Sequence, residues 1–186
     1  MTHKRPPSRI AAGKIALERW TLADLDGLFA AVATSIEHLR PWMPWAANPE
    51  RSAMAQFLSA CEEGWASGER FEYAIRGHGR DVLGSAGLKR RIAPGGLEVG
   101  YWVHQAHTRH GVATQAVQAP VDAEFELGWV THLEIRHDEA NVASGGIPRA
   151  LGFRLLGMFP SEPVAPAETG NEARWRLDAV HAPQQQ

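Results

Sequence analysis

The 186-residue chain contains a single cysteine, Cys61. One thiol excludes an internal disulfide and a zinc site built from cysteine ligands, and it fits a reducing, cytoplasmic setting. Acidic and basic residues nearly balance, with 21 Asp and Glu against 19 Lys and Arg. This balance gives no electrostatic footprint for nucleic acid and no polybasic patch for a lipid surface. No apolar run approaches membrane-spanning length, so neither nucleic acid nor membrane is an expected partner.

Length and composition predict one globular domain. A hydrophobic share of 44% and a charged share of 22% are ordinary for such a domain. The length is enough for one core and short for two. The basic segment at residues 1–9 is not followed by an apolar segment of signal-peptide type, and we expect it to be a flexible lead-in. We expect the domain over residues 10–180 and a flexible tail over residues 181–186.

The most informative stretch runs from Leu97 to Ala119. A period-two pattern from Leu97 to Val103 predicts a strand. The polar segment HQAHTRHG follows and ends in Gly111, and from Val112 the apolar residues recur at helical spacing. A strand–loop–helix junction directs backbone N–H groups and a positive helix end into one small volume, which favours an anion such as phosphate. The signal is weak alone, because many such junctions bind nothing.

The rest of the chain mixes strand and helix patterns. Further helices are expected after Thr21, from about Pro49 to Trp65, and from Val142, and Pro120 should bend the helix that begins at Val112. These elements predict a mixed α/β sheet of about six or seven strands flanked by helices. The other expected strands are Ile10–Trp20, Phe71–Ile75, Val82–Lys89, Thr131–Arg136, Phe153–Met158 and the segment ARWRLDAV.

Two segments, taken in order, resemble a known family. They are EVGYWVHQAHTRHGVATQAV at residues 98–117 and NVASGGIPRALGFRLLG at residues 141–157. The pair resembles the acyl-CoA-binding core of the GNAT N-acetyltransferase superfamily. LRPWMPWA at residues 39–46 and ETGNEARWRL near the end are similar to segments of its RimJ/RimL-type branch. The resemblance spans about residues 10–178 and implies a GNAT-like fold, with a mostly antiparallel sheet that splays centrally.

The resemblance implies acetyl-CoA as co-substrate and no metal. The family's phosphate loop has Arg or Gln, two residues, Gly, one residue, then Gly or Ala. Gly111 and Ala113 match, whereas Thr108 stands at the position of the long polar residue and the adjacent Arg109 could supply the charge. The implied acetyl-CoA contacts are Arg109, His110, Gly111, Val112, Ala113 and Thr114 in the loop, Trp102, Val103 and His104 at the strand end, and Asn141 and Ser144 in the second segment.

The implied reaction is direct acetyl transfer to an amine, without a covalent enzyme intermediate. The N–H of about Val103 would lie near the thioester carbonyl oxygen, which needs a donor as it becomes an oxyanion. Ser144 is the candidate proton donor to the departing thiolate. The alternative for Ser144 is a first-turn residue that only satisfies a helix N–H, and Asn141 caps that helix in either case.

The candidate general base is Glu98, which the strand alternation places on the same side as Trp102. The alternative is a surface carboxylate paired with Arg90 or Arg91. Glu134 on the next expected strand is the second candidate, and a water chain could also remove the amine proton.

The acceptor site is expected beside LRPWMPWA, with Trp42, Trp45 and Glu98 as substrate contacts. Core packing of this loop is the competing interpretation. His104, His107 and His110 are interpreted as loop or phosphate neighbours, because no metal-ligand spacing supports zinc.

The resemblance implies a primary amine as acceptor, either a protein N-terminus such as that of a ribosomal protein or a small molecule, and the chain is expected as a monomer or homodimer. The alternative function is a non-catalytic acyl-CoA-binding or sensing protein of the same fold.

Overall fold

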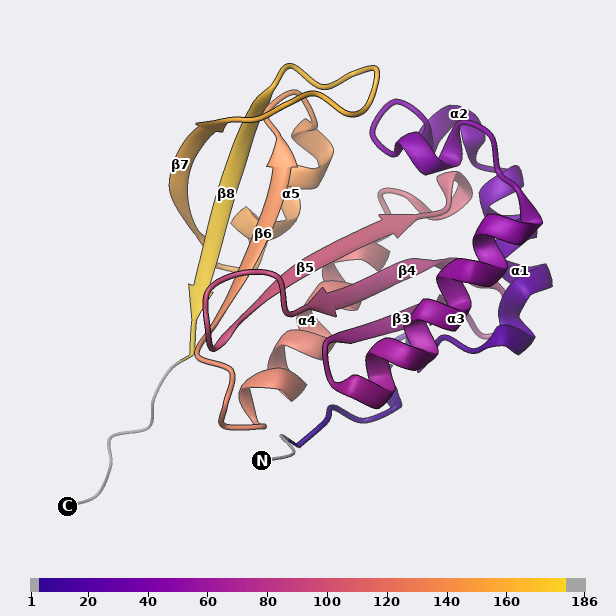
Figure 1. Cartoon of the computed structure of the whole chain (residues 1–186), viewed down its shortest axis with the longest axis horizontal. Helices are drawn as coiled ribbons and strands as arrows, with labels where there is room; N and C mark the ends of the chain where they lie inside the picture. The colour runs from indigo at the N-terminus through magenta and orange to yellow at the C-terminus, as the bar shows by residue number, and fades with distance from the viewer. Residues whose placement is uncertain (1–3, 180–186) are drawn as a thin grey trace.

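The computed structural model describes residues 4–179, and within them eight strands form one sheet in the order β1-β2-β3-β4-β5-β6-β8-β7 (Figure 1). All neighbours are antiparallel except β5 and β6, which are parallel. Residues 1–3 of the expected lead-in and the whole expected tail lie outside the described residues. The strands are β1 Arg9–Ala12, β2 Ile15–Arg19, β3 Arg70–Arg76, β4 Val82–Lys89, β5 Gly96–Val103, β6 His132–Asp138, β7 Arg154–Pro160 and β8 Asn171–Asp178.

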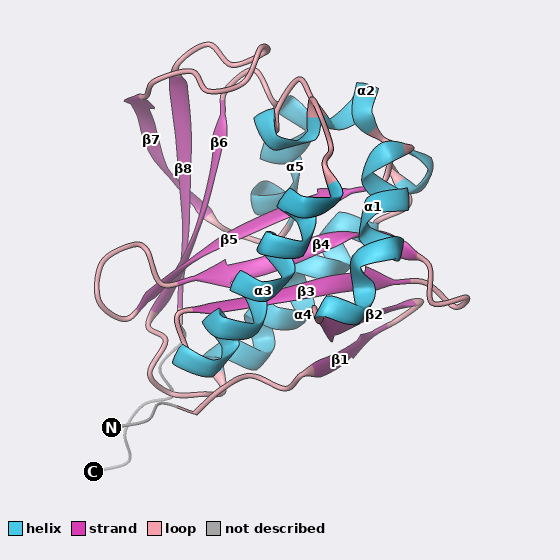
Figure 2. Ribbon diagram, turned by 45° about the vertical axis from the view of Figure 1, so that its right-hand side comes forward, coloured by secondary structure: helices cyan, strands magenta, loops and turns pink. Residues whose placement is uncertain are grey.

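The helices cover both faces of this sheet. Figure 2 shows α1 and α3 in front of β3 and β4, with α4 behind them. α4 also contacts α5, which packs against β6. Across residues 4–179, no helix has both the length and the apolarity needed to cross a bilayer. The helices are α1 Leu25–Ala33, α2 Ile36–Leu39, α3 Arg51–Ser67, α4 Val112–Phe125, which runs through Pro120, and α5 Val142–Ala150.

The first expected strand is in fact a hairpin. β1 and β2 are joined by a turn in which Gly13 has a φ of +62°, and Ile10 lies opposite Leu17. A positive φ is easy for glycine and strained for other residues, so Gly13 allows the chain to reverse within what looks like one alternating run. This hairpin raises the strand count from the predicted six or seven to eight.

The two faces of the sheet have separate cores. The core on the α4 side is built around Leu17, Leu88, Leu133 and Val117, which are fully buried. The core on the α1 and α3 side contains Trp20, Val32, Leu58 and, at the end of β5, Trp102. Because each helix buries one apolar face against the sheet, the ends of β4 and β5 are held rigidly between the two layers.

The sheet splays open between β5 and β6. The two strands pair only from Gly96 opposite His132 to Val99 opposite Ile135. Beyond Val99, β5 continues to Val103 and β6 continues to Asp138 without pairing to each other, and they diverge visibly in Figure 1. This is the central splay that the sequence led us to expect.

Candidate active site

The end of β5 presents backbone groups to the opening. The His104 N–H donates to the Leu83 carbonyl oxygen of β4 at 2.7 Å. Donors in an antiparallel ladder alternate between its two sides, so the N–H groups of Tyr101 and Val103 point toward the side from which β6 has diverged. The predicted position of the Val103 N–H at this edge therefore agrees with the strand geometry.

The His104 side chain fastens the strand end to the segment after α1. Its Nδ1 accepts from the Ala106 N–H at 3.1 Å, so in the neutral ring Nε2 carries the proton and donates to Thr34 Oγ1 at 2.8 Å. Burial and two neighbouring histidines lower the pKa of His104, which favours this neutral form. Ser35 Oγ accepts from the Gln105 N–H at 3.1 Å. We call the side chains of Thr34, Ser35 and His104, together with the backbone of Gln105 and Ala106, the β5 clasp.

The phosphate-loop candidate lies directly after the clasp. Arg109 and Gly111 both have positive φ, at +63° and +74°, and they turn the chain into α4. Among the described residues, none places a side chain on the first N–H groups of α4. Thr108 donates to the Gln105 carbonyl oxygen at 3.0 Å and so holds the loop from within. The N–H groups at the start of α4, which no side chain caps among the described residues, and the positive end of the helix dipole are features suited to an anion.

Ser144 lies across the opening from β5. The Asn141 side chain accepts from the Ser144 N–H at 3.1 Å, which confirms Asn141 as the cap of α5. The Tyr101 hydroxyl donates to the Ser144 carbonyl oxygen at 2.9 Å and lies 3.2 Å from Ser144 Oγ. Because the single Tyr101 proton goes to the carbonyl, the Ser144 hydroxyl is the donor in the second contact.

Tyr101 is a site residue that the sequence interpretation missed. Burial raises the pKa of Tyr101 to about 12, against a smaller lowering by its hydrogen bond with Ser144. The phenol therefore keeps its proton at neutral pH. The strand alternation separates Tyr101 from Trp102, but nothing local in the sequence points to a partner 43 residues away.

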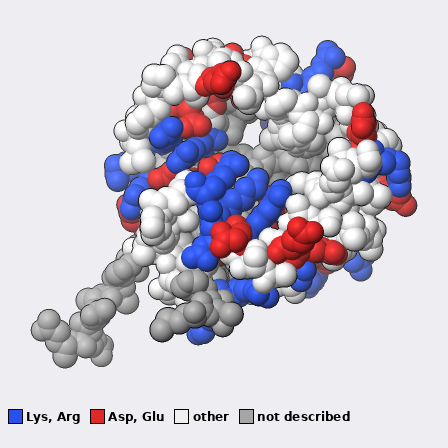
Figure 3. All heavy atoms as spheres, viewed as in Figure 1, with Lys and Arg blue, Asp and Glu red and all other residues white. Residues whose placement is uncertain are grey.

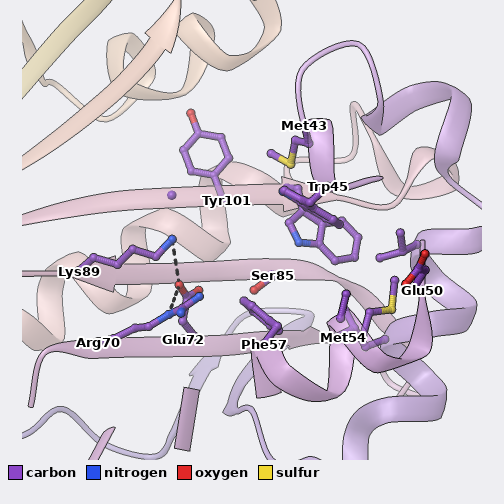
Figure 4. Close-up of a pocket in the computed structure, with 15 residues that line it drawn as sticks. Met43, Trp45, Glu50, Met54, Phe57, Arg70, Glu72, Ser85, Lys89 and Tyr101 are labelled. Carbon is purple, nitrogen blue, oxygen red and sulfur yellow. Dashed lines mark hydrogen bonds and ion pairs between the residues drawn. The ribbon is translucent and has the colours of Figure 1, made fainter. Parts of the chain in front are cut away.

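A cavity of about 410 Å³ opens on the face of β5 that carries Trp102 (Figure 4). Its apolar wall includes Met43, Met54 and Phe57. The Trp45 ring packs edge-on against the Trp102 ring, with the centroids 6.0 Å apart. Trp45 is among the described residues that line the cavity, as expected, whereas Trp42 is not. Tyr101 also lines it and so lies between the cavity and α5.

Two carboxylates, Glu50 and Glu72, line this cavity; neither was a sequence candidate, and the buried one is Glu72. It accepts from Arg70 Nε at 3.0 Å and pairs with Lys89 Nζ at 3.1 Å (Figure 4). Its side chain occupies the space above Gly87, its cross-strand partner, where a Cβ would lie 1.9 Å from Glu72 Oε2. Gly87 is therefore required for Glu72 to fit against the sheet, a pairing that depends on register and not on local sequence.

Glu98 and Glu134 lie opposite each other on β5 and β6, beside the cavity and not in its lining. Glu98 receives two hydrogen bonds from Arg91, which raise the pKa of Arg91, and lies 3.8 Å from Arg136. Glu134 accepts from Arg136 at 2.9 Å. The ion pair with Arg91 agrees with the alternative interpretation of Glu98 as a carboxylate paired with Arg90 or Arg91. The role of general base stays a prediction for both Glu98 and Glu134.

Within residues 4–179, no three His, Cys, Asp or Glu side chains are grouped so that they could hold a metal ion. Cys61 is buried on α3, and burial raises the pKa of its thiol to about 12. This thiol is therefore inert packing and not a nucleophile.

A family model described as the acetyltransferase (GNAT) domain matches residues 14–154. The chain therefore belongs to the GNAT acetyltransferase family, as the sequence resemblance predicted. No curated protein sequence matches the chain.

Solved structures with the same fold include members of the RimJ/RimL branch. RimL, a ribosomal L7/L12 alpha-N-protein acetyltransferase solved with coenzyme A, is 16% identical at a TM-score of 0.84, covering 91% of this chain and 97% of that chain. Mycobacterium smegmatis RimJ, solved with CoA-disulfide, is 20% identical at a TM-score of 0.81, and the match covers 95% of this chain and 87% of that chain. The microcin C7 self-immunity acetyltransferase MccE, solved with acetyl-CoA and AMP, is 15% identical at a TM-score of 0.82, and the match covers 89% of this chain and 93% of that chain. At these identities the likeness shows the GNAT fold.

Proposed function

We propose that the protein transfers an acetyl group from acetyl-CoA directly to a primary amine. One observation supports the proposal: the splayed end of β5 lies between the uncapped start of α4, which suits an anion, and the cavity, with Tyr101 at the junction. A donor with a pyrophosphate and an acceptor with an amine can therefore approach the same strand end from two sides.

The donor site would use mainly backbone groups. Residues 109–114 contain no proline, so each supplies an N–H, and the αL turns at Arg109 and Gly111 direct the loop around the start of α4. Arg109 adds a positive side chain that Thr108 cannot supply. Beyond the loop, the strand end at Trp102, Val103 and His104 would border an extended pantetheine arm, which would pair through the Val103 backbone, and Asn141 would contact the arm from the start of α5.

The chemistry follows from where the hydroxyl groups lie. The acceptor nitrogen forms a bond to the acetyl carbon, the carbon–sulfur bond breaks, and the leaving thiolate takes a proton. The Val103 N–H would stabilise the carbonyl oxygen as it becomes negative. The linked hydroxyls of Tyr101 and Ser144 would supply the proton to sulfur, and water or one of the carboxylates Glu98 and Glu134 would take the proton from the ammonium group.

The acceptor would enter the 410 Å³ cavity, whose size suits a small amine or the first residues of a polypeptide. RimL is a protein acetyltransferase acting at an amino terminus, and the likeness in fold supports a protein N-terminus as one acceptor class. A small-molecule amine is the other. A monomer or homodimer in a cytoplasmic setting stays the expectation from sequence.

The test combines binding with turnover. CoA should raise the melting temperature, and acetyl-CoA should release free thiol only when an accepted amine from a panel of N-terminal peptides, polyamines, amino acids and aminoglycosides is present. Stabilisation by CoA without turnover across the panel would favour the non-catalytic acyl-CoA-binding alternative. An unchanged melting temperature with CoA and acetyl-CoA would refute both functions.

A further inference from the structure

The sheet face that carries Trp102 is apolar under α1 and α3 and charged beyond them, where Figure 1 shows β6 and β8 without a covering helix on this side. Cross-strand partners share a face, so the strand register defines what this surface displays. We call it the charged face. One row across it runs Arg70, Lys89, Glu98, Glu134, Arg176 and Arg154, the next row includes Arg136 and Arg174, and Arg91 folds over from the loop after β4. Glu172 and Asp178, which alternate with these two arginines along β8, share the face.

On β5 and β6 the carboxylates of this face lie deeper than the cations around them. The side chains of Glu98 and Glu134 are 10% and 11% exposed, whereas that of Arg91 is 58% exposed and those of Arg174 and Arg176 are each 32% exposed. Over β5 and β6 solvent therefore meets guanidinium groups above buried carboxylates. On β8, Arg174 and Arg176 are paired through Nε with Glu172 and Asp178, whose side chains are 25% and 53% exposed. Figure 3 shows Lys and Arg side chains gathered in the middle of this view, beside a hollow and with Asp and Glu side chains at their margins.

The charged face continues into the cavity. Arg70 and Lys89 belong to its first row and also line the cavity wall. A polypeptide whose amino terminus occupies the cavity would therefore leave it across guanidinium groups. This local cationic layer contrasts with the net charge of −2 on the whole chain, which disfavours a general role in nucleic-acid binding.

We infer that the charged face binds an acidic segment of the acceptor polypeptide, just after the amino terminus that is acetylated; this inference rests on the proposed function. Arg174 and Arg176 are two residues apart on one strand, hence about 6.7 Å apart, which is also the spacing of alternate side chains in an extended peptide. Each contacts its own carboxylate neighbour through Nε, and a guanidinium group carries further N–H donors with which it can pair with a second carboxylate. Three strand spacings separate Lys89 on β4 from Arg176 on β8, about 14 Å, which an extended chain spans in about four residues.

The first test compares peptides that share their first two residues and carry Glu, Gln or Lys at the next six positions. At low ionic strength kcat/KM should be roughly 10-fold higher for the Glu peptide than for the Gln peptide, and the difference should shrink as salt rises. Equal values for the Glu and Gln peptides would overturn the inference and leave acetyl transfer intact. Absence of turnover with every amine, together with no stabilisation by CoA, would instead refute the proposed function.

The second test locates the effect. The double variant Arg174→Gln with Arg176→Gln should reduce kcat/KM for the Glu peptide to the level of the Gln peptide and leave the Gln peptide unchanged. Arg176→Lys should retain most of the preference. Arg9→Gln, an exposed cation at the far end of the sheet on β1, is the matched control and should change neither peptide.

A binding assay makes the test independent of turnover and of the double variant's folding. A fluorescent Glu peptide with its amino terminus already acetylated should bind the wild-type protein by anisotropy, more weakly as salt rises, and the matching Gln peptide should bind at least several-fold more weakly. Equal binding of the two peptides would overturn the inference. Tighter binding of a single-stranded oligonucleotide of the same charge would overturn it in favour of a nucleic-acid site.

Discussion

Glu124 on α4 predicts a specific pH dependence of stability. The side chain is fully buried, and neither carboxylate oxygen has a hydrogen-bond partner among the described residues. Burial disfavours the charged form and raises the pKa of Glu124 from 4.5 to about 8. The carboxyl group is therefore protonated in the folded protein at neutral pH.

The sign and size of the pH effect on the free energy of unfolding follow from the difference in proton binding between the folded and unfolded chain. Below pH 4.5 both the folded and the unfolded chain hold this proton, and stability does not depend on it. Between pH 4.5 and 8 only the folded chain keeps it, so the free energy of unfolding falls as pH rises, at up to about 1.4 kcal/mol per unit. From pH 5 to pH 8 the loss is on the order of 3–4 kcal/mol, or roughly 10 °C in melting temperature for a domain of this size.

Glu124→Gln removes the titrating group and keeps the shape. Urea unfolding should be measured for wild type and variant at pH 5, 6, 7 and 8. From pH 5 to pH 8, the free energy of unfolding of the variant should rise by about 3–4 kcal/mol relative to that of wild type. Any fixed cost of the buried amide shifts all four points equally and leaves this slope intact. Glu126→Gln, exposed on the same turn, is the control and should run parallel to wild type. A Glu124→Gln series parallel to wild type would refute the buried, protonated carboxyl.

Three further predictions concern the site. Gly111→Trp should fill the phosphate loop and abolish CoA binding detectable by calorimetry. Gly128→Trp, at a similar φ of +78° just after α4, is the control and should retain CoA binding. Equal CoA affinities for the two variants would reject the assignment of the phosphate loop. Tyr101→Phe should lower kcat about 100-fold and Ser144→Ala about 10-fold with CoA affinity retained, and a full-rate Tyr101→Phe would remove the phenol from proton transfer. Glu98→Gln should flatten the alkaline rise of kcat/KM, and an unaltered pH profile would exclude Glu98 as base.

Much of the fold could be predicted because its signals are local. The strand, loop and helix from Leu97 to Ala119 appear as β5, the loop at residues 104–111 and α4, because period-two and helical spacing are decided by near neighbours. The Asn141 cap was predictable for the same reason, since its partner Ser144 is three residues away. The reversal at Gly13 was missed because a single glycine inside an alternating run carries no strong turn signal.

The site was predictable only in part, because its pairings are long-range. The contact between Tyr101 and Ser144, and the placement of Glu72 above Gly87, depend on which strands become neighbours and in which register. Composition suggested that both tryptophans of LRPWMPWA contact the acceptor, yet only Trp45 turns into the cavity lining. Such facts follow from tertiary packing, which spacing along the chain does not encode.

The β5 clasp has a consequence for how this protein can vary. Thr34 and Ser35 belong to the acceptor side, whereas His104 and Gln105 lead into the donor loop, and hydrogen bonds join them in pairs. Losing the side chain of Thr34 or His104 removes the hydrogen-bond partner of the other, so we expect these two positions to change together among related sequences. The Ser35 hydroxyl accepts from the backbone N–H of Gln105, which a change of side chain at 105 retains. A change of acceptor preference that reshapes the α1–α2 segment would then carry a compensating change at the edge of the donor site, which links the evolution of the two specificities.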